Sequence, residues 1–302
     1  MKAMCAKWCS YGLVLAAALP AWADVAAYSA GYQVNYRQAD GVAPSVYAAA
    51  FFYAISADAG DATNASITSG PTGETIDLFE VLPGIFQGGV AFGDEASMHA
   101  AFPGGSYLLA VTGGSLGNQS GEIEMLSPPH YPDTVPAFDA AQIGEYQAID
   151  GLADYEFRFN TFSSSGTLDQ AYVVIDAYPS TRRVFFAPVD PGSGSVVVPA
   201  GTLRLNRRYV ATLLFLSVIE RENAGFQSAT SGSNAWYTTD VLIRTAGNCP
   251  SDYNGDGFVD FFDFADFVAE FESGDPYADY NSDGFIDFFD YNDFVAAFEI
   301  GC

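Results

Sequence analysis

Acidic and amide side chains recur at fixed spacing near the end of the chain. The pattern D-x-N-x-D-G-x-x-D-x-x-D begins at Asp252 and begins again at Asp279. The oxygen-bearing side chains of the two copies are Asp252, Asn254, Asp256, Asp260 and Asp263, and Asp279, Asn281, Asp283, Asp287 and Asp290. No Lys or Arg lies within residues 249–302 to balance these carboxylates. Hard oxygen donors at this density predict a site for a hard cation.

The spacing within each copy is that of an EF-hand type calcium loop. Positions one, three, five and twelve would supply side-chain oxygens, and position nine commonly acts through a water. Phe258 and Phe285, at position seven, would supply backbone carbonyls. Gly257 and Gly284, at position six, permit the positive φ of the turn. We therefore expect two Ca²⁺ ions, bound in strong coupling to folding. The alternative is an acidic, solvated turn repeat without metal.

Each loop is followed by a segment with helical periodicity, and Ser273-Gly274 ends the first of them. The expected apolar stripes are Phe261, Phe264, Val268 and Phe271, and Phe288, Tyr291, Val295 and Phe298. Phe262 and Phe289 fall outside these stripes, on the face that carries alanines and acids. An aromatic side chain on a solvated face indicates contact with a partner. The alternative is that both residues pack against the β region or the other repeat.

Two loop–helix units whose loops end in Asp resemble a type I dockerin, above all the variants that close with Gly-Cys, as Gly301-Cys302 does here. The resemblance covers residues 249–302. It implies a small α-helical calcium-binding domain that docks to a cohesin-like or other surface protein through loop positions ten and eleven. Phe262 and Phe289 occupy position eleven, where cohesin-binding dockerins often carry small or polar residues, so the partner's identity stays open.

The resemblance also accounts for the two cysteines that bracket this segment. In dockerins, two antiparallel repeats bring the ends of the domain together, which implies a disulfide between Cys249 and Cys302. A loop of this length would gain about 4 kcal/mol of stability by the chain-entropy model. Two free or intermolecular thiols are the alternative.

The remaining sequence indicates two all-β units without sustained helical periodicity. Short β-type runs separated by turn residues occupy residues 24–127 and, more regularly, residues 137–246, with a proline-rich linker at 128–136. We expect two β-sandwich domains of immunoglobulin or fibronectin type III-like architecture, followed by the dockerin-like domain: a mainly β protein.

The second unit resembles fibronectin type III through the stretch GSVVVPAGTLRLNRRYVATLLF. Leu203 stands six residues before Tyr209, as in the tyrosine corner of that family, which implies a phenol bonded back to the backbone. Tyr107, after a Pro-Gly-Gly turn, is a fainter counterpart in the first unit. Such sandwiches host many unrelated functions, so the resemblance concerns the fold alone.

The first 23 residues have the basic start, short apolar core and Ala-Trp-Ala site of a secretory signal. Their removal takes both lysines and leaves nine arginines against 37 acidic residues, a net charge of −28. This charge excludes a basic patch for nucleic acid or an anionic membrane, and favours cations, neutral sugars or basic proteins as partners. Adaptation to saline surroundings would give the same charge. No later stretch is apolar for long enough to span a bilayer. We expect a secreted, extracellular or cell-surface protein.

Candidate catalytic groups are sparse. Gly113–Gly117 fits G-x-S-x-G, but neither a helix nor a suitable later histidine follows, so we expect a hairpin turn. His99 and His130 are too few for a multi-histidine zinc site. Glu122/Glu124 and Asp154/Glu156 are the nearest approach to the paired carboxylates of glycoside hydrolysis.

The sequence therefore favours an anchor that carries non-catalytic β modules. One alternative is a polysaccharide-degrading enzyme or carbohydrate-binding component on the same tail, and another is a structural surface-layer protein. A row of solvent-facing Trp or Tyr residues on one sandwich face would favour sugar binding.

Overall fold

The computed structural model describes residues 25–301, except for several short segments. The gaps are residues 40–41, 164–167, 179–181, 205–206, 223–225, 227–229, 247–248, 250, 255–257, 275–277, 279 and 282–284. The predicted signal at residues 1–23 lies outside the described residues. None of the helices in the described part is long and apolar enough to cross a membrane.

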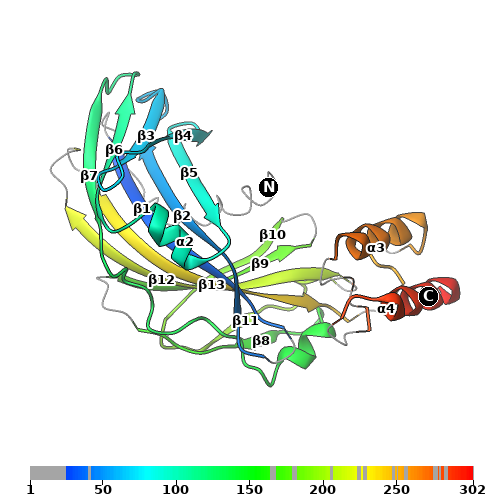
Figure 1. The fold of residues 1–302 in the computed structure, drawn as a ribbon. Helices are drawn as coiled ribbons and strands as arrows, with labels where there is room; N and C mark the ends of the chain where they lie inside the picture. Colours follow the sequence, from blue (N-terminus) through cyan, green and yellow to red (C-terminus); the bar gives the residue numbers. More distant parts are fainter. Residues whose placement is uncertain are drawn as a thin grey trace.

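The protein is mainly β, and most of its strands belong to one strongly curved sheet (Figure 1). The strand order in this sheet is β10-β9-β12-β13-β1-β2-β5-β4-β3-β6-β7, and β11-β8 form a separate pair. The strands are β1 (Val25–Arg37), β2 (Ser45–Ala57), β3 (Asn64–Ser69), β4 (Thr75–Leu82), β5 (Ile85–Phe92), β6 (Gly105–Thr112), β7 (Gln119–Met125), β8 (Tyr155–Arg158), β9 (Leu168–Ala177), β10 (Arg183–Val189), β11 (Ser195–Val198), β12 (Arg208–Glu222) and β13 (Thr230–Arg244). The helices are α2 (Glu95–Ala101), the 3-10 helix η2 (Ile143–Gln147), α3 (Phe261–Ser273) and α4 (Phe288–Ile300).

The strands of the two expected β units are joined in this one sheet. β1 pairs with β13 in parallel, from Ala27 opposite Thr230 to Arg37 opposite Asp240. On its other side β1 pairs with β2 in antiparallel fashion. β1 is buried along almost its whole length, so both of its edges and both of its faces need partners. The long strand β13 pairs with one edge of β1, and β2 pairs with the other.

Two apolar cores lie on one face of the sheet. The first is built from β1 to β7 and α2, with Tyr32, Phe51 and Tyr107 among its buried aromatic residues. The second lies where β9, β12 and β13 meet the β11-β8 pair and η2, and contains Phe157 and Phe215. The two expected units thus have separate cores although they share a sheet.

The sequence analysis predicts no helix in either β unit, so the helix α2 differs from that expectation. Asp94 begins it: its side chain accepts a hydrogen bond from the Ser97 N–H, as an N-cap does. Residues 128–136, expected to be a linker, lie against the body. The Tyr131 ring stacks on Tyr237 with centroids 4.7 Å apart, and its hydroxyl lies 3.1 Å from His99 Nε2.

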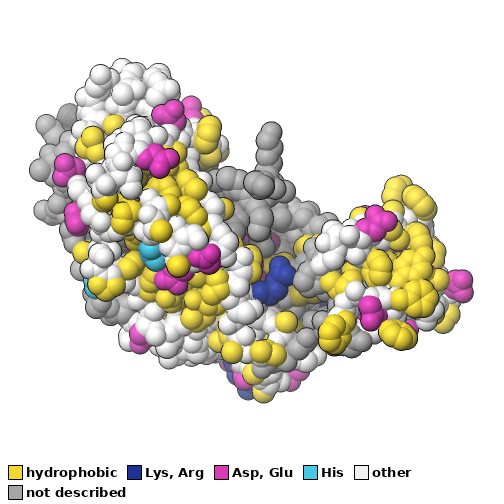
Figure 2. All heavy atoms as spheres, viewed as in Figure 1, with side chains coloured by type: hydrophobic (Ala, Val, Ile, Leu, Met, Phe, Trp, Pro, Cys, Tyr) yellow, Lys and Arg dark blue, Asp and Glu magenta, His cyan; other side chains and the backbone are white. Residues whose placement is uncertain are grey.

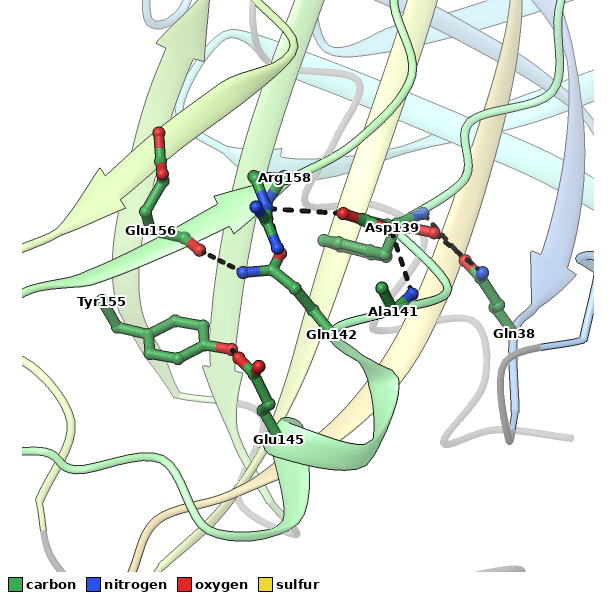
Figure 3. A network of polar contacts seen from close by, with 9 residues as sticks. Gln38, Asp139, Ala141, Gln142, Glu145, Tyr155, Glu156 and Arg158 are labelled. Atoms are coloured by element: carbon green, nitrogen blue, oxygen red, sulfur yellow. Dashed lines mark hydrogen bonds and ion pairs between the residues drawn. The ribbon is translucent and has the colours of Figure 1, made fainter.

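A polar network binds the segment that leads into η2 to the sheet (Figure 3). The Gln38 amide donates to the Phe138 carbonyl at 2.9 Å and accepts from the Phe138 N–H at 2.8 Å. Gln142 makes the same kind of paired contact with β8, to the Glu156 carbonyl and the Arg158 N–H. Each amide thus pairs with backbone groups as a neighbouring strand would.

The tyrosine corner expected at Tyr209 is present. Its hydroxyl accepts a hydrogen bond from the Arg204 N–H at 2.8 Å, and Leu203 is buried beside it. Tyr107, the fainter counterpart, donates to the Pro103 carbonyl at 2.7 Å. In both units a buried phenol fixes the turn that precedes a core strand.

We predict that Tyr209→Phe lowers the free energy of unfolding by about 1 kcal/mol, because the Arg204 N–H loses its acceptor. Urea denaturation measures this change. Tyr155→Phe, which removes a hydroxyl bonded to Glu145 at the surface, is the control and should change stability less. Equal losses in the two variants would contradict a special role for the corner.

Candidate functional site

Residues 249–302, called the tail below, form two equivalent loop–helix units beyond one end of the sheet (Figure 1). Asp260 and Asp287 are the N-caps of α3 and α4, and each forms a capping box with the aspartate three residues on. Gly274, in the left-handed conformation, ends α3, as the sequence predicts. The same sequence pattern thus produces the same local structure twice.

The helices meet through a small aromatic core. Phe267 and Phe294 are fully buried and stack with centroids 4.1 Å apart, and the Tyr253 ring meets both edge-on. Phe264, Val268 and Phe271, and Tyr291, Val295 and Phe298, pack against this core as expected.

The expected stripes were wrong at their first residues. Phe261 and Phe288 are exposed, because each is the first residue of its helix and precedes the turn that faces the partner helix. Phe267 and Phe294, absent from the expected stripes, take the central places. Their spacing of three residues from Phe264 and Tyr291 is the sequence signal that identifies them.

The last carboxylate of each loop closes that loop on itself. Asp263 is fully buried and accepts hydrogen bonds from the Asn254 N–H and the Asp260 N–H, both at 2.9 Å. Asp290 is equally buried and accepts from the Asn281 N–H at 3.1 Å and the Asp287 N–H at 2.9 Å. Loop position twelve thereby holds positions three and nine in both repeats.

This arrangement fits a calcium loop in its described part. An ionised carboxylate has about four lone-pair sites, so two N–H bonds leave Asp263 and Asp290 able to ligate a cation. Asp256, Asp279 and Asp283 lie outside the described residues. Within the described ones, no group of three or more His, Cys, Asp or Glu side chains is arranged to hold a metal. The two calcium ions stay a prediction.

The two phenylalanines expected to contact a partner are exposed. Phe262 is 65% exposed and Phe289 64%, so neither packs against the β body or the other repeat. Phe258 and Phe285 of the loops, with Phe261 and Phe288, are exposed as well. Figure 2 shows hydrophobic side chains gathered over the tail. Equivalent residues of the two repeats therefore present aromatic rings to solvent.

Cys249, which opens the tail, is buried and disulfide-bonded. Cys302, its expected partner, lies outside the described residues, so the pairing of these two cysteines stays a prediction.

The tail is fastened to the β body, residues 25–246, by a buried ion pair. Arg208 at the start of β12 donates to both oxygens of Glu270 on α3, at 2.7 and 3.1 Å. The Tyr253 hydroxyl donates to the same carboxylate, and the Arg208 guanidinium lies 4.0 Å from the centre of the Tyr253 ring. Arg207 donates to the carbonyl of Asn254, a residue of the first loop. The sequence analysis missed this junction, since nothing in the spacing links residues 208 and 270.

The charge of Arg208 is retained despite burial. Burial lowers the pKa of Arg208, but Tyr253, Glu270 and Tyr178 together raise it by more, so the pKa lies above its ordinary value. A buried guanidinium with two carboxylate bonds and an aromatic face is a preorganised contact. Together with the bond from Arg207 to Asn254, this contact holds α3 and the first loop in one position relative to the sheet.

The other candidate residues lie in a turn, at the surface or in structural hydrogen bonds. Gly113–Gly117 is the turn between β6 and β7, with positive φ at Gly113, Gly114 and Gly117, and Ser115 bonds to Asp61. Glu122 and Glu124 are exposed on β7. Asp154 accepts from the Ala200 N–H at 2.8 Å, which gives it a structural role.

No protein-family model and no curated protein matches this chain. Among solved structures, the BSP domain of a biofilm associated protein aligns at 11% identity and a TM-score of 0.20, over 67% of this chain and 28% of its own. The chicken CNTN1 FN1–FN3 domains align at 12% and 0.23, over 73% of this chain and 69% of theirs. A 1.5-MDa bacterial ice-binding adhesin aligns at 14% and 0.21, over 73% and 66%. The chain thus spans 28% of the length of the first of these.

We predict that Arg208→Leu lowers the free energy of unfolding by about 3–5 kcal/mol, because Glu270 is left buried without its counter-charge. It should also speed proteolysis between body and tail. Urea denaturation and limited digestion with subtilisin, a protease of broad specificity, measure the two effects. Arg158→Leu removes a surface ion pair to Asp139 and should cost less than about 1 kcal/mol. Similar losses in the two variants would overturn the assignment of the junction.

Proposed function

We propose that this protein is a secreted, calcium-binding protein whose dockerin-like tail anchors the β body to an extracellular or cell-surface partner. The supporting observation is the exact repetition of one arrangement in the two loop–helix units. In each unit a buried aspartate at position twelve closes an acidic loop, and a phenylalanine at position eleven points into solvent. An acidic turn repeat that binds no ligand would need neither the buried aspartate nor the exposed phenylalanine.

The charge of the tail supports a metal. Each loop gathers four aspartates, and residues 249–302 contain no Lys or Arg. Among the arginines next to the tail, Arg207 contacts the Asn254 carbonyl and Arg208 contacts Glu270, while Arg244 interacts electrostatically with Asp252 of the first loop. Two calcium ions would reduce the repulsion among the carboxylates and hold each loop around its ion. The expected Cys249–Cys302 disulfide would close the same segment at its ends.

The chemistry of the docking surface indicates the kind of partner. Phe262 and Phe289 each lie two residues after an N-cap aspartate. Their helices carry Asp266 and Asp293 on the exposed faces. A complementary surface would hold two apolar pockets for the rings, with basic side chains around them. A cohesin-like module with such pockets is the partner we propose.

We predict that calcium raises the free energy of unfolding of the full chain, by about 2.7 kcal/mol per site at 100 times Kd, and that EGTA reverses this. Asp263→Asn with Asp290→Asn should remove the effect, because a carboxylate is lost from each loop. Asp266→Asn with Asp293→Asn makes the same charge change on the exposed helix faces and should keep it. Thermal denaturation with calorimetric titration provides the measurement, and stability independent of calcium in the unmodified chain would refute the proposal.

We further predict that Phe262→Ala with Phe289→Ala abolishes capture of the cell-surface partner and leaves calcium affinity unchanged, because the rings are exposed and do not support the loops. Surface plasmon resonance on the purified partner measures the loss. Leu152→Ala, at an exposed apolar residue of the β body, is the control. Retained capture by the double alanine variant would exclude these rings as the contact.

A further inference from the structure

The two acidic loops of the tail share a sequence pattern but have different surroundings. In the first loop, residues 252–263, Asp252 is 4% exposed and Asn254 is half-buried. In the second loop, residues 279–290, Asn281 is exposed. Asn254 and Asn281 both occupy position three of their loops. The same position is therefore covered in one repeat and open to solvent in the other.

The backbone of Asn254 is bonded on both sides. Its N–H donates to Asp263, the last aspartate of the loop, at 2.9 Å. Its carbonyl accepts from the Arg207 guanidinium of the β body at 2.5 Å. Arg207 is itself fixed, because its N–H donates to the Thr245 hydroxyl at 2.9 Å. The backbone of Asn254 thus connects the closed first loop to the sheet.

Position two of the first loop is held by the β body as well. The Arg208 guanidinium lies 4.0 Å from the centre of the Tyr253 ring, and the same ring meets Phe267 of the tail core edge-on. The Tyr253 hydroxyl donates to Glu270, which accepts both bonds from Arg208. Two consecutive positions of the first loop, two and three, therefore contact the β body.

The second repeat lacks the acid on which this contact depends. Ala297 stands where the first repeat has Glu270, seven residues after the last aspartate of the loop in each case. Tyr280 is the counterpart of Tyr253, and its buried hydroxyl has no hydrogen-bond partner among the described residues. The sequence thus repeats the loops and the helix caps but provides the junction only once.

Arg244 at the end of β13 does not distinguish the two repeats. Burial lowers the pKa of Arg244, while Tyr280 of the second loop and Asp252 of the first both oppose that shift. Its charge therefore acts on both loops. The difference between the loops comes from the contacts of Arg207 and Arg208.

These contacts favour the closed form of the first loop. The Asn254 backbone bonds Asp263 and Arg207 at the same time, so the β body holds the loop as its last aspartate closes it. A loop already held in this form has less conformational entropy to lose when a ligand binds. The charge of Arg208 is balanced by Glu270, so this pair positions the loop without a net charge that would repel a cation.

We propose that Arg208, Glu270 and Tyr253 are positioning residues of the first calcium loop, so that calcium binding there is coupled to the junction with the β body. Binding in the second loop is not coupled to it. The inference rests on the calcium-binding function proposed above. Coupling is reciprocal: the junction strengthens binding in the first loop, and binding there strengthens the junction by the same factor. The first loop then fixes the tail on the β body, and the second can fill or empty without moving it.

Two variants of the full chain separate the loops. Asp290→Asn leaves the first loop intact, and Asp263→Asn leaves the second intact. Both remove one charge at position twelve and retain an acceptor oxygen. Arg208→Lys is then added to each chain, because lysine keeps the charge but loses the two-bonded fork and the contact with the aromatic ring.

Arg208→Lys should raise the dissociation constant for calcium at least fivefold in the Asp290→Asn chain and leave it unchanged in the Asp263→Asn chain, as measured by calorimetric titration. Saturating calcium should slow subtilisin cleavage between body and tail in the Asp290→Asn chain only. Arg158→Lys, at the surface pair with Asp139, is the control and should alter neither result.

Equal changes in the dissociation constants of the two chains, or equal protection of both by calcium, would overturn this inference and leave the calcium proposal standing. Absence of calcium binding in the unmodified chain would refute both. Tyr253→Phe removes only the hydroxyl bond to Glu270 and serves if Arg208→Lys does not fold. It should weaken calcium binding in the Asp290→Asn chain by a smaller factor, and equal binding with and without this hydroxyl would contradict the inference.

Discussion

The parallel pairing of β1 with β13 is the constraint on which the rest of the structure depends. It joins the first described strand to the last strand of the β body, across almost the whole length of that body. The chain between β1 and β13 must therefore fold as a loop whose two ends are held together. The entropy lost in closing so long a loop is offset because β1 is then bonded on both edges and buried on both faces. The pairing merges two sets of strands, each with its own core, into one sheet.

The junction between the β body and the tail depends on a buried ion pair and not on strand pairing. Arg208 and Glu270 form a buried, charged and geometrically restricted contact, with Tyr253 against both. Such a contact specifies one orientation rather than adding much net stability. It joins the end of the second core to the first acidic loop, so the placement of the loop and of its exposed phenylalanines is tied to the sheet.

Much of the local structure could be predicted from the sequence. The aspartate spacing and the glycines predict two loops, the caps and apolar periodicity predict two helices, and Leu203 with Tyr209 predicts the tyrosine corner. Each of these signals acts over a few residues, where backbone geometry and hydrogen bonding leave few alternatives. Even here, the first residues of the apolar stripes were misassigned, because helix ends and the position of the partner helix decide which ring is covered.

The tertiary structure alone decided the rest. The shared sheet and the Arg208–Glu270 pair both join residues far apart in the chain. Glutamine and asparagine carry no pattern that distinguishes a bonded amide, such as Gln38, from an unbonded one, such as Gln87. That difference depends on which backbone groups lie within about 3 Å of the amide, and only the packing of distant strands determines them.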